Sequence, residues 1–277
     1  MILERSRVKI GLEKPVKLLH ITDSHLTLVD GRDDERKRSL GGRLGRWDKE
    51  ENLREQIAYG EETCDLIVHT GDLMDFVSKA NVEFAKEVLK NEKILFIAGN
   101  HDFSQYVGEA WEDKAYRMNS YMQMGGGLGV PMFFSSRTVG GVNVVGIDNG
   151  YYLFEDWQLW RLKREVEKGL PVILAFHDPV FEESLYRRHM ELHPDSPAYL
   201  AGCDEEHLLP YSEFRAVQQR PDAPTLRMIE YIKSEPAIRA VLAGHLHMNY
   251  ESELREGLPQ FVTGGGFRGC AREITLV

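Results

Sequence analysis

The sequence predicts an α/β fold in which a largely buried sheet is flanked by helices. Three observations support this prediction: short apolar runs that end in turn residues, helix-like segments between these runs, and polar clusters directly behind them. Alternation of buried strands with helices is typical of sheets whose two faces are both covered. The chain of 277 residues is long enough to bury a large core, and no linker divides it. We therefore expect one domain spanning residues 1–277.

Short apolar runs with glycine or polar residues behind them favour strands over helices. The predicted strands are residues 16–22, 66–70, 94–98, 172–176 and 238–243, and a further strand-like run covers residues 142–148. Helix-like patterns lie between them, at residues 50–62, 81–89, 156–168 and 225–234.

Two stretches are interpreted as insertions on this framework. Residues 30–47 are rich in Arg, Lys, Asp and Gly and are predicted to form an exposed loop. A solvated run of charges is the simpler interpretation of that loop, and a loop that grips substrate is the alternative. Residues 181–224 are rich in proline and contain three histidines. Functional loops of unusual length commonly serve as lids or binding loops, so a lid or cap is expected within this segment.

The composition narrows the class of function. The net charge of −10, from 34 basic and 44 acidic residues, disfavours broad electrostatic binding to nucleic acid. Metal ions can nevertheless make one pocket positive inside an acidic protein. The three cysteines have no paired spacing, so neither a disulfide framework nor a cysteine zinc site is expected. No signal-peptide pattern and no membrane-spanning run is apparent, and a cytoplasmic protein without membrane contact is expected.

A polar cluster follows each of the five predicted strands. In such sheets ligands bind outside the carboxyl ends of the strands, so we expect these clusters to meet. Residues two apart on an extended segment point to the same side, which lets both members of an Asp-x-His or His-x-His pair approach one ion. The candidate metal ligands are Asp23, His25, Asp72, Asn100, His177, His245 and His247. Such carboxylate, amide and imidazole ligands suit two adjacent divalent or trivalent ions.

The order and content of these motifs, from Asp23 to His247, resemble the calcineurin-like metallophosphoesterase superfamily. The most specific motif is the string Gly-Asn-His-Asp at residues 99–102. The resemblance implies a β-sandwich flanked by helices, with four layers in the order α-β-β-α. It also implies two metal ions bridged by Asp72, with the other ligands divided into one set of Asp23, His25 and His247 and a second set of Asn100, His177 and His245. His101 then matches the catalytic histidine, and Asp102 is predicted to orient its ring.

The expected function is hydrolysis of phosphate esters. A metal-bridging hydroxide, formed from water whose pKa is lowered to about 7, attacks phosphorus, and His101 donates a proton to the leaving group. Iron, manganese and zinc all suit the ligand set. The leading prediction is a phosphodiesterase acting on a small or cyclic nucleotide-like substrate. The alternatives are a phosphomonoesterase of small molecules or phosphoproteins, a DNA nuclease, which the acidic charge disfavours, and a non-catalytic scaffold, which the presence of His101 disfavours. The sequence leaves the oligomeric state open.

Several residues near the motifs have simpler structural interpretations. Asp75 is expected either to cap the following helix or to support a ligand histidine. His20 and His69 lie inside apolar runs and are interpreted as hydrogen-bonded core histidines. Asn149 is interpreted as a turn residue, and contact with the substrate is the alternative. The three glycines at residues 264–266 are predicted to form a plain turn near the site, because no Lys-Ser or Lys-Thr pair follows them.

Overall fold

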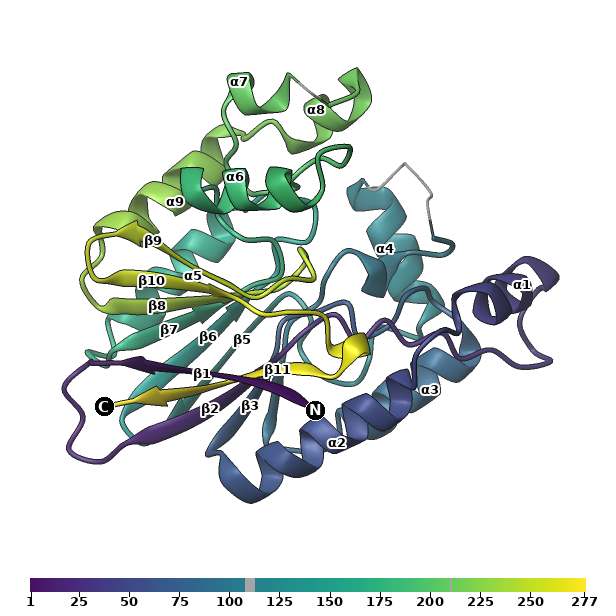
Figure 1. Ribbon diagram of the computed structural model, residues 1–277, viewed down its shortest axis with the longest axis horizontal. Coiled ribbons are helices and arrows are strands. Elements are labelled where there is room, and N and C mark those ends of the chain that lie inside the picture. The colour runs from purple at the N-terminus through teal and green to yellow at the C-terminus, as the bar shows by residue number, and fades with distance from the viewer. Residues whose placement is uncertain (108–112, 210) are drawn as a thin grey trace.

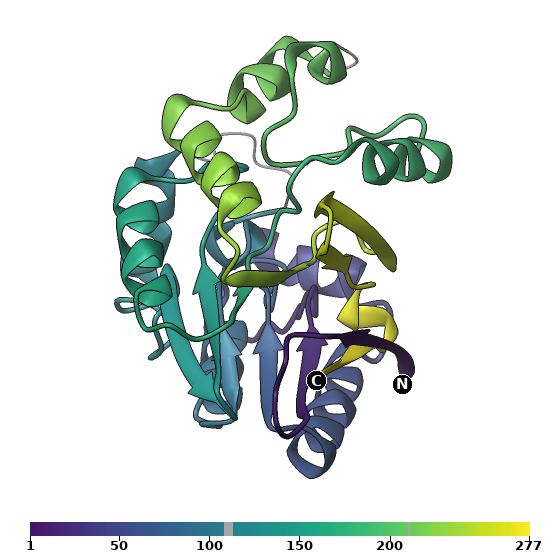
Figure 2. The same ribbon diagram turned by 90° about the vertical axis from the view of Figure 1, so that its left-hand side faces the viewer.

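The computed structural model describes residues 1–107, 113–209 and 211–277. Within these residues, two β-sheets pack face to face and helices cover both outer faces (Figures 1 and 2). The five-stranded sheet has the order β1-β11-β2-β3-β4, and the six-stranded sheet has the order β5-β6-β7-β8-β10-β9. This arrangement confirms the predicted α-β-β-α sandwich. The pattern of apolar runs had indicated a sheet flanked by helices, and the division into two sheets followed from the family resemblance.

Each sheet contains three neighbouring parallel strands. In the five-stranded sheet these are β2 (Val16–Ile21), β3 (Leu66–His69) and β4 (Ile94–Phe96). In the six-stranded sheet they are β6 (Val142–Ile147), β7 (Val172–Ala175) and β8 (Ile238–Ala243). All six correspond to the strands expected from the apolar runs. The sequence analysis missed the remaining strands, which are β1 (Ile2–Val8), β5 (Phe134–Val139), β9 (Tyr250–Arg255), β10 (Leu258–Val262) and β11 (Cys270–Leu276).

The four predicted helices are confirmed with small shifts at their ends. They are α2 (Lys49–Thr63), α3 (Lys79–Val88), α5 (Asp156–Val166) and α9 (Ala223–Ser234). The described residues also form α1 (Glu35–Leu44), α4 (Lys114–Gln123), α6 (Glu183–Leu192), α7 (Glu205–Leu208) and α8 (Glu213–Gln219), together with two 3-10 turns at His101–Phe103 and Gly266–Arg268.

Strand alternation explains the layers. In β2, Leu18 packs into the apolar cluster between the two sheets, whereas Leu19 packs into the cluster beneath α2 and α3. In β7, Ile173 faces the other sheet and Leu174 faces α5 and α9. Because successive side chains of a strand point to opposite faces, an uninterrupted apolar run supplies both cores at once.

One prediction about the loops is wrong. Residues 30–47 do not form a plain exposed loop, because α1 occupies most of them. The side chain of Asp34 caps this helix by accepting a hydrogen bond from the backbone N–H of Lys37. Leu40 is buried, and Gly41 lies against Val29 so closely that a side chain there would clash. The helix thus depends on a cap and a few buried contacts, which the charged composition of the segment conceals.

Residues 181–224 are more ordered than a simple loop. They contain α6, α7 and α8, which project beyond the sheets at the top of Figure 1. Their apolar residues form a separate cluster with the end of the six-stranded sheet, which includes Leu185, Leu200 and Leu208 together with Leu246 and Val262. The segment is therefore anchored next to the residues that follow β8. No helix in the described part of the chain has both the length and the apolar character needed to cross a bilayer.

The predictions for His20 and His69 are confirmed. Both rings are buried, and His20 contacts the Thr70 hydroxyl at 2.8 Å and the Thr263 hydroxyl at 2.7 Å. Ser24 Oγ lies 3.0 Å from His69 Nε2, and the Gly71 N–H donates to His69 Nδ1. Each histidine is therefore satisfied inside the core.

We expect His20 to make folding sensitive to acid. Burial, followed by the nearby charge of Arg272, lowers the pKa of His20 from 6.5 to about 3. Between these two values the unfolded chain binds more protons than the native protein, so the free energy of unfolding falls as the pH is lowered. The slope for one such histidine approaches about 1.4 kcal/mol per pH unit. Urea unfolding of metal-free protein between about pH 7 and pH 5 measures this slope. His20→Gln should make it shallower, and an unchanged slope in that variant would contradict the assignment.

Candidate metal centre

The predicted ligands follow the parallel strands, and their side chains gather at one end of both sheets. Asp23 follows β2, Asp72 follows β3, and His177 and His245 follow β7 and β8. Two sheets therefore contribute to a single site, because the carboxyl ends of their parallel strands point the same way. Among the described residues, groups of three potential ligands bring their ligand atoms within 4.8 Å of one another.

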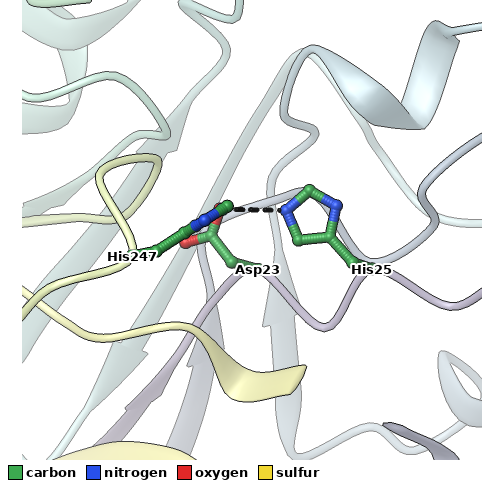
Figure 3. A group of neighbouring side chains, drawn as sticks. All are labelled: Asp23, His25 and His247. Atoms are coloured by element: carbon green, nitrogen blue, oxygen red, sulfur yellow. Dashed lines mark hydrogen bonds and ion pairs between the residues drawn. The ribbon is translucent and has the colours of Figure 1, made fainter. Parts of the chain in front are cut away.

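The first group consists of Asp23, His25 and His247 (Figure 3). His25 Nε2 lies 3.0 Å from His247 Nε2, the contact drawn as a dashed line. Asp23 Oδ1 lies 3.3 Å from His247 Nε2 and 3.7 Å from His25 Nε2. One oxygen and two nitrogens thus converge on a common point.

The second group consists of Asp72, His177 and His245. His177 Nε2 lies 3.2 Å from Asp72 Oδ2 and 3.1 Å from His245 Nδ1. Asp72 Oδ2 also lies 3.6 Å from His25 Nε2, a member of the first group. A single carboxylate oxygen therefore stands between the two groups, the position that a bridging ligand requires.

The residues fit a pair of metal ions on their own geometry. Asp23 Oδ1 and Asn100 Oδ1 are buried oxygens without a hydrogen-bond partner. Buried polar atoms are otherwise nearly always paired, so a carboxylate oxygen without a hydrogen bond beside facing imidazole nitrogens fits a role as a metal ligand. Asn100 follows directly in the chain on Gly99, which packs against Asp72 and His177 of the second group. A side chain at Gly99 would overlap the Asp72 carboxylate.

The backbone is strained at most of the proposed ligands. Five of them have φ in the left-handed region: Asp23 (52°), His25 (47°), Asp72 (51°), His245 (67°) and His247 (51°). This conformation costs a residue with a side chain about 1–2 kcal/mol. Strain of this kind persists where the surrounding structure enforces it, and it is concentrated at functional sites. The strain here aims the side chains inward at the strand ends.

Hydrogen bonds hold two of the ligand rings by their second nitrogen. His177 Nδ1–H donates to the carbonyl oxygen of Thr70 at 2.7 Å, and His25 Nδ1–H donates to Asp75 Oδ1 at 2.9 Å. Each of these rings thereby presents Nε2 to the site. Asn149 holds the strand end behind His177, since its Oδ1 accepts from the backbone N–H groups of His177 and Asp178, both at 3.0 Å. Asn149 therefore does more than form a turn, because its side chain fixes the backbone behind His177.

His101 is oriented by a different residue from the one predicted. Its Nδ1 lies 3.0 Å from Asp75 Oδ1 and 3.0 Å from the carbonyl oxygen of the same residue. The carboxylate of Asp102 instead accepts hydrogen bonds from the backbone N–H groups of Met74, at 3.0 Å, and Gly99, at 2.9 Å. The prediction that Asp102 orients the His101 ring is therefore wrong. Asp102 ties together the two loops that carry Asp72 and Asn100.

Carboxylates around His101 shift the pKa of its ring upwards. Burial of the ring acts against protonation, but the charge of Asp72 and the hydrogen bond to Asp75 outweigh it and raise the pKa of His101. The His101 ring lines the clefts on the site and can reach a bound group there. A protonated imidazole in this position is a candidate proton donor.

We expect Asp75→Ala to weaken the site through the two histidines that it holds. His25 and His101 both lose the carboxylate that contacts their Nδ1, so metal affinity and turnover should each fall about 10- to 100-fold. Metal titration monitored separately from turnover distinguishes this effect from unfolding.

Asp102→Asn is the matched control, since it alters a buried carboxylate that contacts neither ring. It should lower the free energy of unfolding by about 1–3 kcal/mol through its backbone partners. Metal affinity of its folded fraction should stay close to that of the unchanged protein. Equal loss of metal affinity in both variants would contradict the role of Asp75.

Two clefts open onto the site and meet at His101 and His247. The larger has a volume of about 550 Å³, and its lining includes Arg43, Arg46, Trp47, Lys49 and Phe267. The smaller has a volume of about 280 Å³, and its lining includes His189, His193, Tyr199 and Arg268. Residues 181–224 therefore contribute side chains to the second cleft.

Sequence reasoning missed most of these lining residues. For the larger cleft the sequence did offer an indication, because a loop that grips substrate was the alternative interpretation of residues 30–47. Three of the lining residues, Arg43, Arg46 and Trp47, lie in that segment. The glycine-rich turn was correctly predicted to lie near the site. The backbone N–H of Gly266 donates to the carbonyl oxygen of Thr22, and the backbone N–H of Phe267 donates to the carbonyl oxygen of Asp23. This turn presents the Phe267 ring to the ligands.

The fold and the clustered ligands are those expected of a metallophosphoesterase. A model of the calcineurin-like phosphoesterase family matches residues 16–249 of the chain. The chain therefore belongs to the calcineurin-like phosphoesterase family and is a phosphoric ester hydrolase.

Individual proteins that match this chain share either a short stretch of its sequence or a low sequence identity. A protein of Psychrobacter arcticus named "Probable cyclic nucleotide phosphodiesterase" is 37% identical over 97 residues, which are 34% of this chain and 34% of that protein. The matched stretch thus spans about a third of either chain. Among solved structures, a purple acid phosphatase of yellow lupin (Lupinus luteus) covers 92% of this chain and 45% of its own, with a TM-score of 0.51 and 13% identity. A dimetal phosphatase from Danio rerio covers 91% of this chain and 88% of its own, with a TM-score of 0.49 and 13% identity. The lupin structure shows the shared fold.

Proposed function

We propose that the protein is a phosphodiesterase acting on small or cyclic nucleotide-like substrates with a dinuclear metal centre. The observation that carries this proposal is the pair of clefts that meet at His101 and His247. A phosphodiester has two organic groups on its phosphorus, and two clefts beside one metal pair provide a place for each. A monoester needs one such cleft. The relative from Psychrobacter arcticus, whose name refers to cyclic nucleotides, supports the same substrate class.

The residues have distinct roles in this proposal. One ion would be held by Asp23, His25 and His247, the other by Asn100, His177 and His245, and Asp72 would be the ligand shared by both. When bound, two such ions supply an acidified water and neutralise charge on the phosphoryl oxygens. With oxygen and imidazole ligands and no thiolate, we propose iron, manganese or zinc as the bound metals.

The chain's own groups then complete the reaction. His101, held at Nδ1 by Asp75, donates a proton through Nε2 to the departing ester oxygen. Its backbone N–H donates to Asp72 Oδ1 at 2.8 Å, which fixes the bridging carboxylate and the catalytic ring relative to each other.

Metal analysis and a substrate panel on one preparation test the proposal. Chromogenic monoester and diester substrates, together with cyclic mononucleotides, are compared after reconstitution with each candidate metal. Preference for diesters by kcat/KM supports the proposal. Hydrolysis of the monoester alone would replace it with the phosphomonoesterase alternative. The cytoplasmic location stays a prediction of the sequence.

A further inference from the structure

The larger cleft has a basic wall that the metal ligands do not explain. Arg43 lies in the last turn of α1, Arg46 lies in the short connection to α2, and Lys49 is the first residue of α2. The same cleft is bounded by His25, His101 and His247. A group bound at the metal pair would therefore extend directly towards three cationic side chains.

The two arginines of this basic wall have no acidic partner among the described residues. Within the described residues, Arg43 and Arg46 form no ion pair or side-chain hydrogen bond, and Lys49 Nζ lies 3.9 Å from Asp75 Oδ2. Some other exposed arginines of the described residues do have carboxylate partners, as Arg227 has in Asp156 at 2.7 Å and Arg32 in Asp30 at 2.6 Å. Unpaired guanidinium groups that line a cleft are suited to bind anions, since their donors match phosphate and carboxylate oxygens.

An aromatic surface joins the basic wall to the metal ligands. The Phe267 ring centroid lies 5.1 Å from that of His247 and 5.7 Å from that of His25. The Trp47 ring follows, 6.3 Å from Phe267, and the residue is 61% exposed. Trp47 also has a φ of 71°, a strained conformation for a residue with a large side chain. A strained, exposed tryptophan at the edge of a cleft indicates a role in binding a flat apolar group.

We propose that this cleft is a second substrate subsite, in which Arg43, Arg46 and Lys49 bind a further anionic group. Trp47 and Phe267 hold the ring of the same substituent. The substrate class is thus a phosphodiester in which one ester group carries both a ring and an additional phosphate, as in a short 5′-phosphorylated oligonucleotide. This inference rests on the proposed function and narrows its substrate.

A matched pair of substrates tests the subsite. Two nucleosides joined by one phosphodiester are compared with the same molecule carrying a 5′-phosphate, so that the scissile bond is identical. The phosphorylated form should have a KM lower by about tenfold, the effect of one charge-assisted hydrogen bond. The double variant Arg43→Gln, Arg46→Gln should remove this preference, so that the two forms have the same KM when both are measured on that variant. The charge-matched control is Arg164→Gln, Arg227→Gln, which replaces exposed arginines of α5 and α9.

Inhibition separates this inference from the proposed function. Adenosine 3′,5′-bisphosphate should inhibit hydrolysis of a chromogenic substrate about tenfold more strongly than adenosine 5′-monophosphate, and the double variant should abolish the difference. Trp47→Leu should weaken both nucleotide inhibitors about tenfold, the scale of one base stacking on an aromatic ring, while inhibition by inorganic pyrophosphate stays unchanged.

A chromogenic monoester serves equally well in this assay, so the subsite is measured even if diesters are not hydrolysed. Failure on diesters alone would overturn the proposed function. Equal inhibition by the mono- and bisphosphate, or a difference that survives in the double variant, would overturn the subsite.

Discussion

Replacing Asp72 by Ala should abolish metal pairing and lower turnover by more than about 10³-fold, beyond the loss for a single positioned electrostatic contact. Asp72 Oδ2 lies between the two ligand groups, 3.2 Å from His177 Nε2 and 3.6 Å from His25 Nε2. Without this oxygen, neither group retains a complete ligand set, and the two ions lose their shared ligand. Elemental analysis should show fewer than two metal ions per chain, and turnover should be measured on the same sample.

The control for Asp72→Ala is Asp195→Ala, which removes an exposed carboxylate in the segment 181–224. This variant should bind two metal ions and keep its turnover. Circular dichroism confirms that both variants are folded. Full metal content and full activity in Asp72→Ala would refute the bridging role and with it the dinuclear centre.

Replacing His101 by Ala should separate catalysis from metal binding. Both ions should be retained, because the contact to Asp72 comes from the backbone N–H of residue 101 and survives the substitution. Turnover should fall about 10²- to 10⁴-fold, the usual contribution of a positioned proton donor. Metal content and kcat measured together establish the separation.

The leaving group provides an internal control for His101. A nitrophenolate departs without a proton, whereas an alkoxide needs one, so the loss in His101→Ala should be greater for alkyl esters than for nitrophenyl esters. Equal loss with both leaving groups would assign His101 to electrostatic stabilisation of the phosphoryl group instead. Unchanged turnover with both substrates would remove His101 from the mechanism.

Much of the fold was predictable because local sequence patterns report strands buried on both faces. Runs such as residues 172–176 and 238–243 are apolar throughout, since one face supplies the core between the sheets and the other supplies the core beneath the helices. The missed strands β1 and β9 lie at sheet edges, where exposed polar residues interrupt the apolar pattern. Helix α1 was missed for a similar reason, because few of its residues are buried.

The site, like the fold, was predictable only in part. The sequence by itself determined the ligand types and their position behind parallel strands, because each motif is local and strand ends converge whatever the details of packing. The tertiary structure alone decided that Asp75, and not Asp102, holds His101, since Asp75 comes from a loop that is distant in the sequence. It also decided that Arg43, Trp47 and Phe267 share one cleft. The contact between Trp47 and Phe267, 220 residues apart, depends on the pairing of β11 with β2 in the five-stranded sheet, and no local pattern records that pairing.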